Sequence, residues 1–483
     1  MTVVGRVAPQ APSPVLGLKA RARSLFAMDP LRLSLFLLTV VTVSRIHQHF
    51  GILAKMRPAL LLFAFATVYA LLNRRALATG DLFRTWPAKV VIGLFLLSCV
   101  GAPFGLSLGG AATYALFAYS KVIIYALLLM VAIRGVRDLA LFVWAYVIAS
   151  ALLLWMALFL FDLKSAYGSN IMRLSNLYTY DANDLGLVLM VGLPLALLLF
   201  QTGTRNIKLI SGLVVLGIGL TTARTGSRGA LVGFIAVGIA LLFGLKRVSV
   251  VKRAGFVAVL VLGLFVAAPQ GYWEQMSTLL NPTQDYNFYD VDGRKAVAKR
   301  GMGYMFQYPL FGVGIDNFGK AEAYISDKAK YWVEGTGLRW TAPHNSWVQA
   351  GAELGIPGML LWGGLVLGGA IYSRRLRRRM PPQWEFGDFE QRFLYFSTIY
   401  LPISFVAFAV TCTFVSFAYL DPLYILAAFL VGIIRSMNQK LREGPAPQVR
   451  ASARPAPTFS GRQRLATLPL HLRAGVEPFP RRK

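Results

Sequence analysis

The feature that most constrains this chain is a series of uninterrupted apolar runs rich in Leu, Ala, Val, Ile and Phe. A helix of about 17–25 apolar residues crosses a bilayer, and many of the runs approach or reach that length. They lack the alternation of polar and apolar residues that a membrane β-barrel requires. The 483 residues are 56% hydrophobic and 15% charged, whereas a soluble protein carries about 25% charged residues. We therefore predict an all-α polytopic membrane protein with about twelve transmembrane helices.

The predicted membrane domain covers residues 31–436, and its longest extramembrane loop is 269–343. Residues 1–30 and 437–483 are basic and rich in Pro, so we expect a disordered arm and a disordered tail. The expected spans are residues 31–45, 57–72, 88–105, 112–133, 138–160, 184–200, 209–223, 229–245, 254–268, 347–372, 393–415 and 421–436.

The formal net charge of +29 is explained by membrane topology rather than by nucleic-acid binding. Lys and Arg cluster in short loops between the runs, and such loops face the cytoplasm. If the cluster at 374–379 is cytoplasmic, alternation of spans brings every other strong cluster and both termini to the same side. The loops expected on the outer side are 45–56, 161–183, 223–228 and 269–343.

The large outer loop is rich in Tyr and Trp, and part of it has helical spacing. Phe318, Ala321, Ile325, Ala329 and Trp332 recur at intervals that place them on one helix face. The aromatic residues fit an interfacial belt at the membrane surface. They equally fit a carbohydrate site, because aromatic rings combine apolar faces with polar tips.

Several outward arginines are not explained by the positive-inside rule. They are Arg173, Arg224, Arg228, Arg294, Arg300 and Arg339. Any one of them can reach lipid headgroups with its long side chain. Together they indicate an anionic ligand, since guanidinium groups bind phosphate oxygens in pairs. The diphosphate of a membrane-anchored lipid fits this placement best.

His344 is the candidate catalytic residue, at the junction between the large loop and the span that follows. A neutral imidazole accepts a proton near pH 7 and can act as a general base. The alternative is a structural His at the start of a helix capped by Asn345 or Ser346. His47 and His49 have no Cys, Asp or Glu neighbours in the sequence, so we predict no metal site. No phosphate-binding Gly-rich loop is present, so we also predict no nucleotide cofactor.

The spacing of His344-Asn345, nine residues, Gly355, two residues and Gly358 resembles the signature of the O-antigen ligase and Wzy-polymerase family. Three further segments resemble the family in the same order, and Arg173 with Asn183 resembles a fourth, weaker pair. The resemblance covers residues 165–372. Its segments are Thr225-Gly226-Ser227-Arg228-Gly229-Ala230, Asp292-Gly293-Arg294, and Pro309-Leu310-Phe311-Gly312-Val313-Gly314 through Asn317-Phe318.

The resemblance implies a GT-C-like fold in the bacterial inner membrane, with a periplasmic site and no metal or nucleotide cofactor. The implied donor is a glycan on undecaprenyl diphosphate. The acceptor is the lipid A core in a ligase, or a second lipid-linked glycan in an O-antigen or exopolysaccharide polymerase. Ala298 stands where the family often has Trp. Because of this departure, the sequence does not distinguish a ligase from a polymerase. The alternative functions are a flippase of lipid-linked sugars, a secondary transporter, or a non-catalytic scaffold that binds partners through its basic tail.

The implied roles can be stated residue by residue. His344 activates the acceptor hydroxyl, and arginines hold the diphosphate. The expected diphosphate-binding residues are Arg173, Arg224, Arg228, Arg294 and Arg300, and the expected supporting residues are Asn183, Asn317 and Asn345.

Overall fold

The computed structural model describes residues 29–73, 77, 82–165, 171–175, 177, 180–244, 249–281, 283, 293–326 and 342–443. The chain forms two units, residues 1–437 and 438–483, and the first unit holds all the predicted site residues. The predicted arm 1–30 and tail 437–483 lie almost wholly outside the described residues, as do Arg339, Ala329 and Trp332.

The elements of the first half alternate long helices with short turns. The helices are α2 (Pro30–Ser44), α3 (Ile46–His49), α4 (Gly51–Met56), α5 (Pro58–Leu72), η2 (Leu82–Arg84), α6 (Trp86–Gly101), η3 (Ala102–Phe104), α7 (Leu108–Thr113), the π-helix η4 (Tyr114–Tyr119), α8 (Ser120–Ala132) and α9 (Val136–Phe159). The strands β1 (Leu163–Ser165) and β2 (Met172–Leu174) follow as an antiparallel pair, with Lys164 opposite Arg173.

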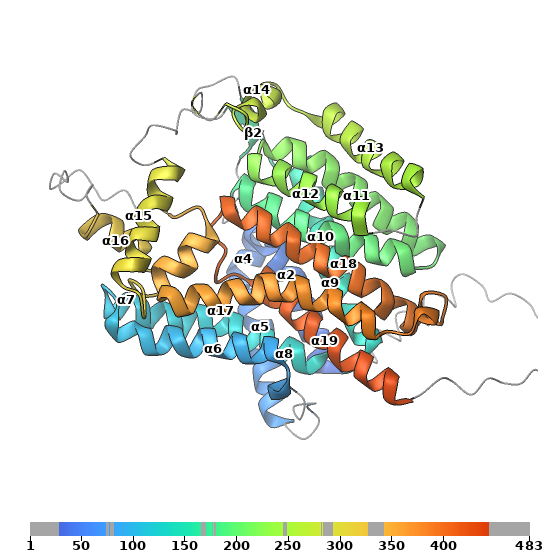
Figure 1. Cartoon of the computed structure of the whole chain (residues 1–483), viewed down its shortest axis with the longest axis horizontal. Coiled ribbons are helices and arrows are strands. Elements are labelled where there is room, and N and C mark those ends of the chain that lie inside the picture. The colour runs from blue at the N-terminus through green and yellow to red at the C-terminus, as the bar shows by residue number, and fades with distance from the viewer. Residues whose placement is uncertain are drawn as a thin grey trace, which may run out of the picture. The chain divides into compact units, whose positions relative to one another are not determined.

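The second half contains most of the candidate site residues. Its helices are α10 (Ala182–Thr202), α11 (Arg205–Thr225), α12 (Arg228–Gly244), α13 (Val250–Ala267), α14 (Tyr272–Ser277), α15 (Arg294–Gln307), α16 (Phe318–Tyr324), α17 (Ser346–Leu376), η7 (Arg377–Arg379), η8 (Pro382–Glu385), α18 (Phe389–Thr411), η9 (Cys412–Phe414) and α19 (Asp421–Glu443). Figure 1 shows α15 beside the first part of α17, and the two helices are in contact.

The prediction of an all-α polytopic membrane protein is confirmed. Nine helices in the described part of the chain are long and apolar enough to cross a membrane. The shorter apolar helices α2, α12 and α13 coincide with the remaining predicted spans. The expected helix from Phe318 is present in part as α16, Phe318–Tyr324, which contains Phe318 and Ala321 and ends before Ile325.

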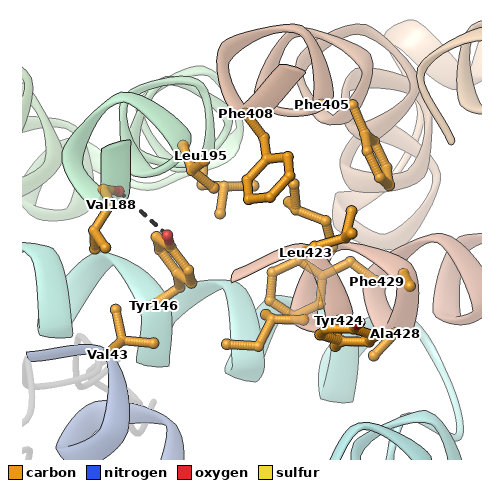
Figure 2. Packing of buried hydrophobic residues seen from close by; sticks show 14 of the residues in the cluster. Val43, Tyr146, Val188, Leu195, Phe405, Phe408, Leu423, Tyr424, Ala428 and Phe429 are labelled. Carbon is orange, nitrogen blue, oxygen red and sulfur yellow. Dashed lines mark hydrogen bonds between the residues drawn. The ribbon is translucent and has the colours of Figure 1, made fainter. Parts of the chain in front are cut away.

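The helices differ sharply in how much of their surface the protein covers. In α10, 89% of the most apolar 18-residue stretch is buried, whereas only 6% is buried in the span Gly51–Leu72. We therefore infer that α10 is surrounded by other helices, whereas most of the surface of the span Gly51–Leu72 faces lipid. Figure 2 shows the core beside α10, where Phe405 and Phe408 of α18 lie near Leu423 of α19.

A buried hydrogen bond crosses this core. The hydroxyl of Tyr146 on α9 donates to the carbonyl oxygen of Val188 on α10 at 3.2 Å (Figure 2). A phenol buried without such a partner would carry a desolvation penalty of about 1–3 kcal/mol. The bond thus satisfies the hydroxyl and fixes α9 against α10.

Small residues let α12 approach its neighbours closely, as is common between membrane helices. A Cβ atom on Gly229 would lie 2.7 Å from Cβ of Phe414, and one on Gly186 would lie 2.6 Å from Cβ of Ala230. A Cβ on Gly233 would clash with Thr411 of α18. The start of α12 is therefore wedged between α10 and the end of α18.

Polar contacts join segments that were predicted to lie on the same side of the membrane, because the spans alternate in direction. Arg32 pairs with Asp138 at 2.6 Å, and Arg134 pairs with Asp29 at 2.9 Å. Arg137, next to Asp138 in the first turn of α9, reaches the carboxylate of Glu390 in the first turn of α18 at 2.9 Å. These segments were all predicted to be cytoplasmic, and the contacts agree with that grouping. The orientation in the membrane itself stays a prediction.

Candidate functional site

His344 occupies an exposed and strained turn immediately before α17. Its φ angle is 44°, in the left-handed region that residues other than Gly rarely adopt. Such a conformation costs about 1–3 kcal/mol and persists only where the surroundings enforce it. The backbone N–H of His344 donates to Oγ of Ser416 at 3.0 Å. The imidazole is thus presented to solvent by a turn that is anchored from another loop.

The residue after His344 caps the helix. Oδ1 of Asn345 accepts from the N–H groups of Trp347 and Val348 at 3.0 and 3.2 Å. Oγ of Ser346 donates to the carbonyl of Val415 at 2.7 Å, which ties the helix start to the α18–α19 connection. Asn345 therefore has the capping role that was the structural alternative, and it supports His344 by fixing the turn.

Gly355 of the His344 pattern has a structural role. α17 is broken at Gly355, where φ is 70° and ψ is −168°. The segment Pro309–Gly314 docks on this break. Pro309 accepts from the N–H of Ile356 at 2.8 Å, and Val313 donates to the carbonyl of Ala352 at 2.8 Å. We call this arrangement the clasp, because the Pro309–Gly314 segment supplies the partners that the interrupted helix has lost.

Asn317 and Glu353 complete the clasp rather than the chemical site. Nδ2 of the fully buried Asn317 donates to the carbonyl oxygens of Val313 and Ser107 at 3.1 and 3.3 Å. Oε1 of Glu353 accepts from the N–H of Phe318 at 3.2 Å. Both polar groups bind backbone, so they fix the path of the chain between α15 and α17.

Opposite charges act on His344 from two other elements. Partial burial lowers the pKa of its imidazole, and the positive charge of Arg294 at the start of α15 lowers it further. The negative charge of Asp181, at the start of α10, opposes this shift. The two loops that carry Arg294 and Asp181 are therefore brought to His344 by the fold.

Asp181 was not predicted from the sequence. Its Oδ1 caps α10 by accepting from the N–H groups of Asn183 and Asp184 at 2.6 and 2.8 Å. Nδ2 of Asn183 donates to the other carboxylate oxygen at 3.1 Å. Asn183, predicted as a supporting residue, thus orients the carboxylate whose charge acts on His344. An Asp before an apolar run is a capping signal, and its link to His344 is visible only in three dimensions.

A second group of arginines surrounds the turn between α11 and α12. Nη1 of Arg228 donates to Oγ1 of Thr278 at 2.8 Å. Arg173 on β2 lies against Gly226, since a Cβ on this glycine would be 3.0 Å from Cβ of Arg173. The N–H of Met172 bonds to the carbonyl of Gln270 at 3.1 Å, which holds β2 beside α14.

Unsatisfied buried polar atoms mark the same turn. Nε of Arg224 and Oε1 of Gln275 are buried and have no hydrogen-bond partner among the residues that the structure describes. A buried polar atom without a partner calls for an explanation, and an absent water, ion or ligand is one such explanation. Arg173, Arg224 and Arg228 therefore form one cationic group, which we call the arginine turn.

Arg300 has a protein partner of its own. Its Nε donates to both carboxylate oxygens of Glu322 at 2.9 and 3.0 Å, and Glu322 is only 3% exposed. The hydroxyl of Tyr304 donates to the same carboxylate at 2.7 Å. This buried network joins α15 to α16. It favours a positioning role for Arg300 over the predicted contact with a diphosphate.

Arg45 is a further cation in a predicted outer loop, and it was not among the predicted site residues. Its guanidinium lies over the ring of Tyr180, 5.3 Å from the ring centre, and Tyr180 immediately precedes Asp181. The positive-inside rule does not explain an arginine in a predicted outer loop. The position of Arg45 in the sequence could therefore have marked it as a candidate site residue. In the described parts of the chain, no group of three or more His, Cys, Asp and Glu is placed to hold a metal ion.

Comparison with known proteins identifies one domain. Residues 212–363 match the family model described as O-antigen ligase. No curated protein matches the chain. The matched segment contains Arg224, Arg228, Arg294, Arg300, Asn317, His344 and Asn345, whereas Arg173 and Asn183 precede it.

Proposed function

Because residues 212–363 match the family model described as O-antigen ligase, we propose that this membrane protein transfers a glycan from undecaprenyl diphosphate to an acceptor hydroxyl. The reaction takes place at the periplasmic face of the inner membrane, with both termini in the cytoplasm. The observation that carries the proposal is the exposed His344, strained into its turn, whose pKa is influenced by the charges of Arg294 and Asp181.

The arginine turn and Arg294 are suited to the diphosphate of the donor. Guanidinium groups remain charged at any working pH and donate paired hydrogen bonds to phosphate oxygens. The unsatisfied Nε of Arg224 supports a ligand at this place. Cations fixed beside a leaving group stabilise the charge that it develops, and this effect supplies several kcal/mol.

His344 is suited to the acceptor. Its lowered pKa keeps the imidazole neutral near pH 7, so that it accepts the proton of the attacking hydroxyl. The acceptor oxygen forms the new bond to the anomeric carbon as the bond to the diphosphate breaks. The leaving undecaprenyl diphosphate takes the electron pair, and the anomeric configuration is inverted. No metal or nucleotide takes part in this scheme.

Substitution of two arginines tests the donor site. We expect Arg228→Gln and Arg294→Gln each to lower the rate of glycan transfer by roughly 100-fold or more, because each removes a charge that stabilises the leaving group. The rate is measured with purified protein and a lipid-linked glycan donor. Arg205→Gln is the matched control, since Arg205 starts α11 and lies roughly 30 Å along that helix from the arginine turn. Equal losses in all three variants would contradict the donor site.

The acceptor decides between ligase and polymerase, and a gene deletion separates them. Single glycan repeats on the lipid A core of the deletion strain indicate a lost polymerase. Full-length chains left on the lipid carrier indicate a lost ligase. A flippase or transporter would move the lipid-linked glycan across the membrane without forming a glycosidic bond, so a product of transfer by the purified protein excludes that alternative.

A further inference from the structure

A large cavity lies at the end of α17 remote from His344, between α12, α17 and α18. Its volume is about 850 Å³, within the range of about 300–1,000 Å³ that small-molecule sites have. Phe243 of α12, Ile371 of α17 and Ile399 of α18 form apolar walls, and Pro382 of η8 closes one side. The cavity is thus built from helices that cross the membrane and from the turn after α17.

The rim of this cavity is strongly cationic. Arg374, Arg375, Arg377 and Arg378 all line it. Arg377 is held in place, because its Nη2 donates to the hydroxyl of Tyr395 at 3.1 Å and its guanidinium stacks over that ring. Arg374, Arg375 and Arg378 are exposed and have no carboxylate partner within the described ranges. Their charges are therefore uncompensated by the described protein.

An apolar cavity with a cationic rim is complementary to an amphiphile with an anionic head. The basic cluster that contains these arginines is also the strongest positive-inside signal in the chain, so the rim is expected at the cytoplasmic surface. Basic pockets between membrane helices on that side suit anionic phospholipid headgroups. We propose that this cavity binds an anionic phospholipid, with its acyl chains between α12, α17 and α18 and its phosphate on Arg374, Arg375 and Arg378.

The proposed lipid site is separate from the residues proposed for glycan transfer. His344 precedes the first residue of α17, whereas the arginines of the rim lie at the end of that helix and in η7. Arg228 begins α12, whereas Phe243 lies next to its last residue. The two proposals can therefore fail independently of each other.

Lipid titration of the full-length protein tests the charged rim. The purified protein in detergent is titrated with dioleoyl phosphatidylglycerol or dioleoyl phosphatidylcholine, and bound lipid is counted by native mass spectrometry. We expect tighter binding of phosphatidylglycerol, and about 30-fold weaker binding after Arg375→Gln with Arg378→Gln, since each basic residue near a membrane surface contributes roughly fivefold. Arg205→Gln with Lys208→Gln is the matched control. It removes the same charge from another loop predicted to be cytoplasmic, and it should leave binding unchanged.

A cavity-filling variant tests the apolar part. A Cβ on Gly244 would lie 3.7 Å from Cδ1 of Ile403, an ordinary contact. A Cβ is therefore accommodated at position 244, and because Gly244 and Ile403 both line the cavity, we expect the Leu side chain to extend into it. We expect Gly244→Leu to abolish the high-affinity binding of phosphatidylglycerol with every rim arginine intact. Equal affinity for the two lipids, equal loss in the control pair, or unchanged binding in Gly244→Leu would overturn the proposal. Binding of a polyprenyl phosphate without binding of phosphatidylglycerol would overturn it as well.

Discussion

Substitution of His344 is expected to abolish glycan transfer while the protein still inserts and folds. The imidazole is the only group in the proposed scheme that takes the acceptor proton, and general bases contribute roughly 100- to 10,000-fold to a rate. His344→Asn is the sharper variant, because Asn tolerates the left-handed backbone that His344 adopts. Its short amide cannot act as a base. The measurements are the transfer rate and the elution of the purified variant in size-exclusion chromatography.

A second histidine gives the matched control. His47 lies in another predicted outer loop and is not part of the proposed site. His47→Asn should therefore transfer glycan at the rate of the unmodified protein. A His344→Asn protein that is well folded and fully active would falsify the assignment of His344 as the base and return it to a structural role at the helix start.

The charges around His344 predict how activity depends on pH. Only the neutral imidazole accepts a proton, so activity is lost as pH falls through the pKa of His344. Because this pKa is lowered, the acid limb should lie below the value of about 6.5 for an unperturbed His. Arg294→Gln removes a positive charge and should move the acid limb to higher pH. Asp181→Asn removes a negative charge and should move it to lower pH. The acid limb is measured in the pH profile of the residual activity of each variant. If both variants have the same acid limb as the unmodified protein, this electrostatic environment is contradicted.

Substitution of Gly355 is expected to cause the largest loss of stability. Its backbone conformation, φ 70° and ψ −168°, is essentially restricted to glycine. A Cβ at this position would also lie 2.6 Å from the carbonyl oxygen of Pro309 in the clasp. Strain and overlap together should cost roughly 3 kcal/mol or more. Gly355→Val should therefore lower the yield of folded protein and its thermal unfolding temperature.

The same helix offers a control for this substitution. Gly364 lies in the regular part of α17, and a Cβ there meets no atom within 4 Å. Gly364→Ala should be neutral or slightly stabilising, because Ala favours a helix over Gly by about 1 kcal/mol. If Gly355→Val unfolds at the same temperature as Gly364→Ala, the clasp does not hold the two parts of α17 together.

The sequence determined the membrane class, the positions of the spans and the resemblance to a family whose model matches residues 212–363. Apolar length is a local property, and a lipid environment forces each such run to satisfy its own backbone hydrogen bonds as a helix. The predicted spans accordingly coincide with helices, including the three short ones. The spacing of His344 to Gly355 and Gly358 likewise pointed to the family whose model matches residues 212–363.

Only the tertiary structure decided what each polar residue does. Arg228 and Arg300 were both predicted to bind the diphosphate. In the structure, Arg228 donates to Thr278 beside the turn with unsatisfied polar atoms, whereas Arg300 is paired with the buried Glu322. Asp181 is distant from His344 in the sequence, yet in the folded chain its negative charge raises the pKa of that imidazole. Charge and hydrogen bonding act over a few ångströms, so the role of a side chain depends on neighbours that sequence spacing does not reveal.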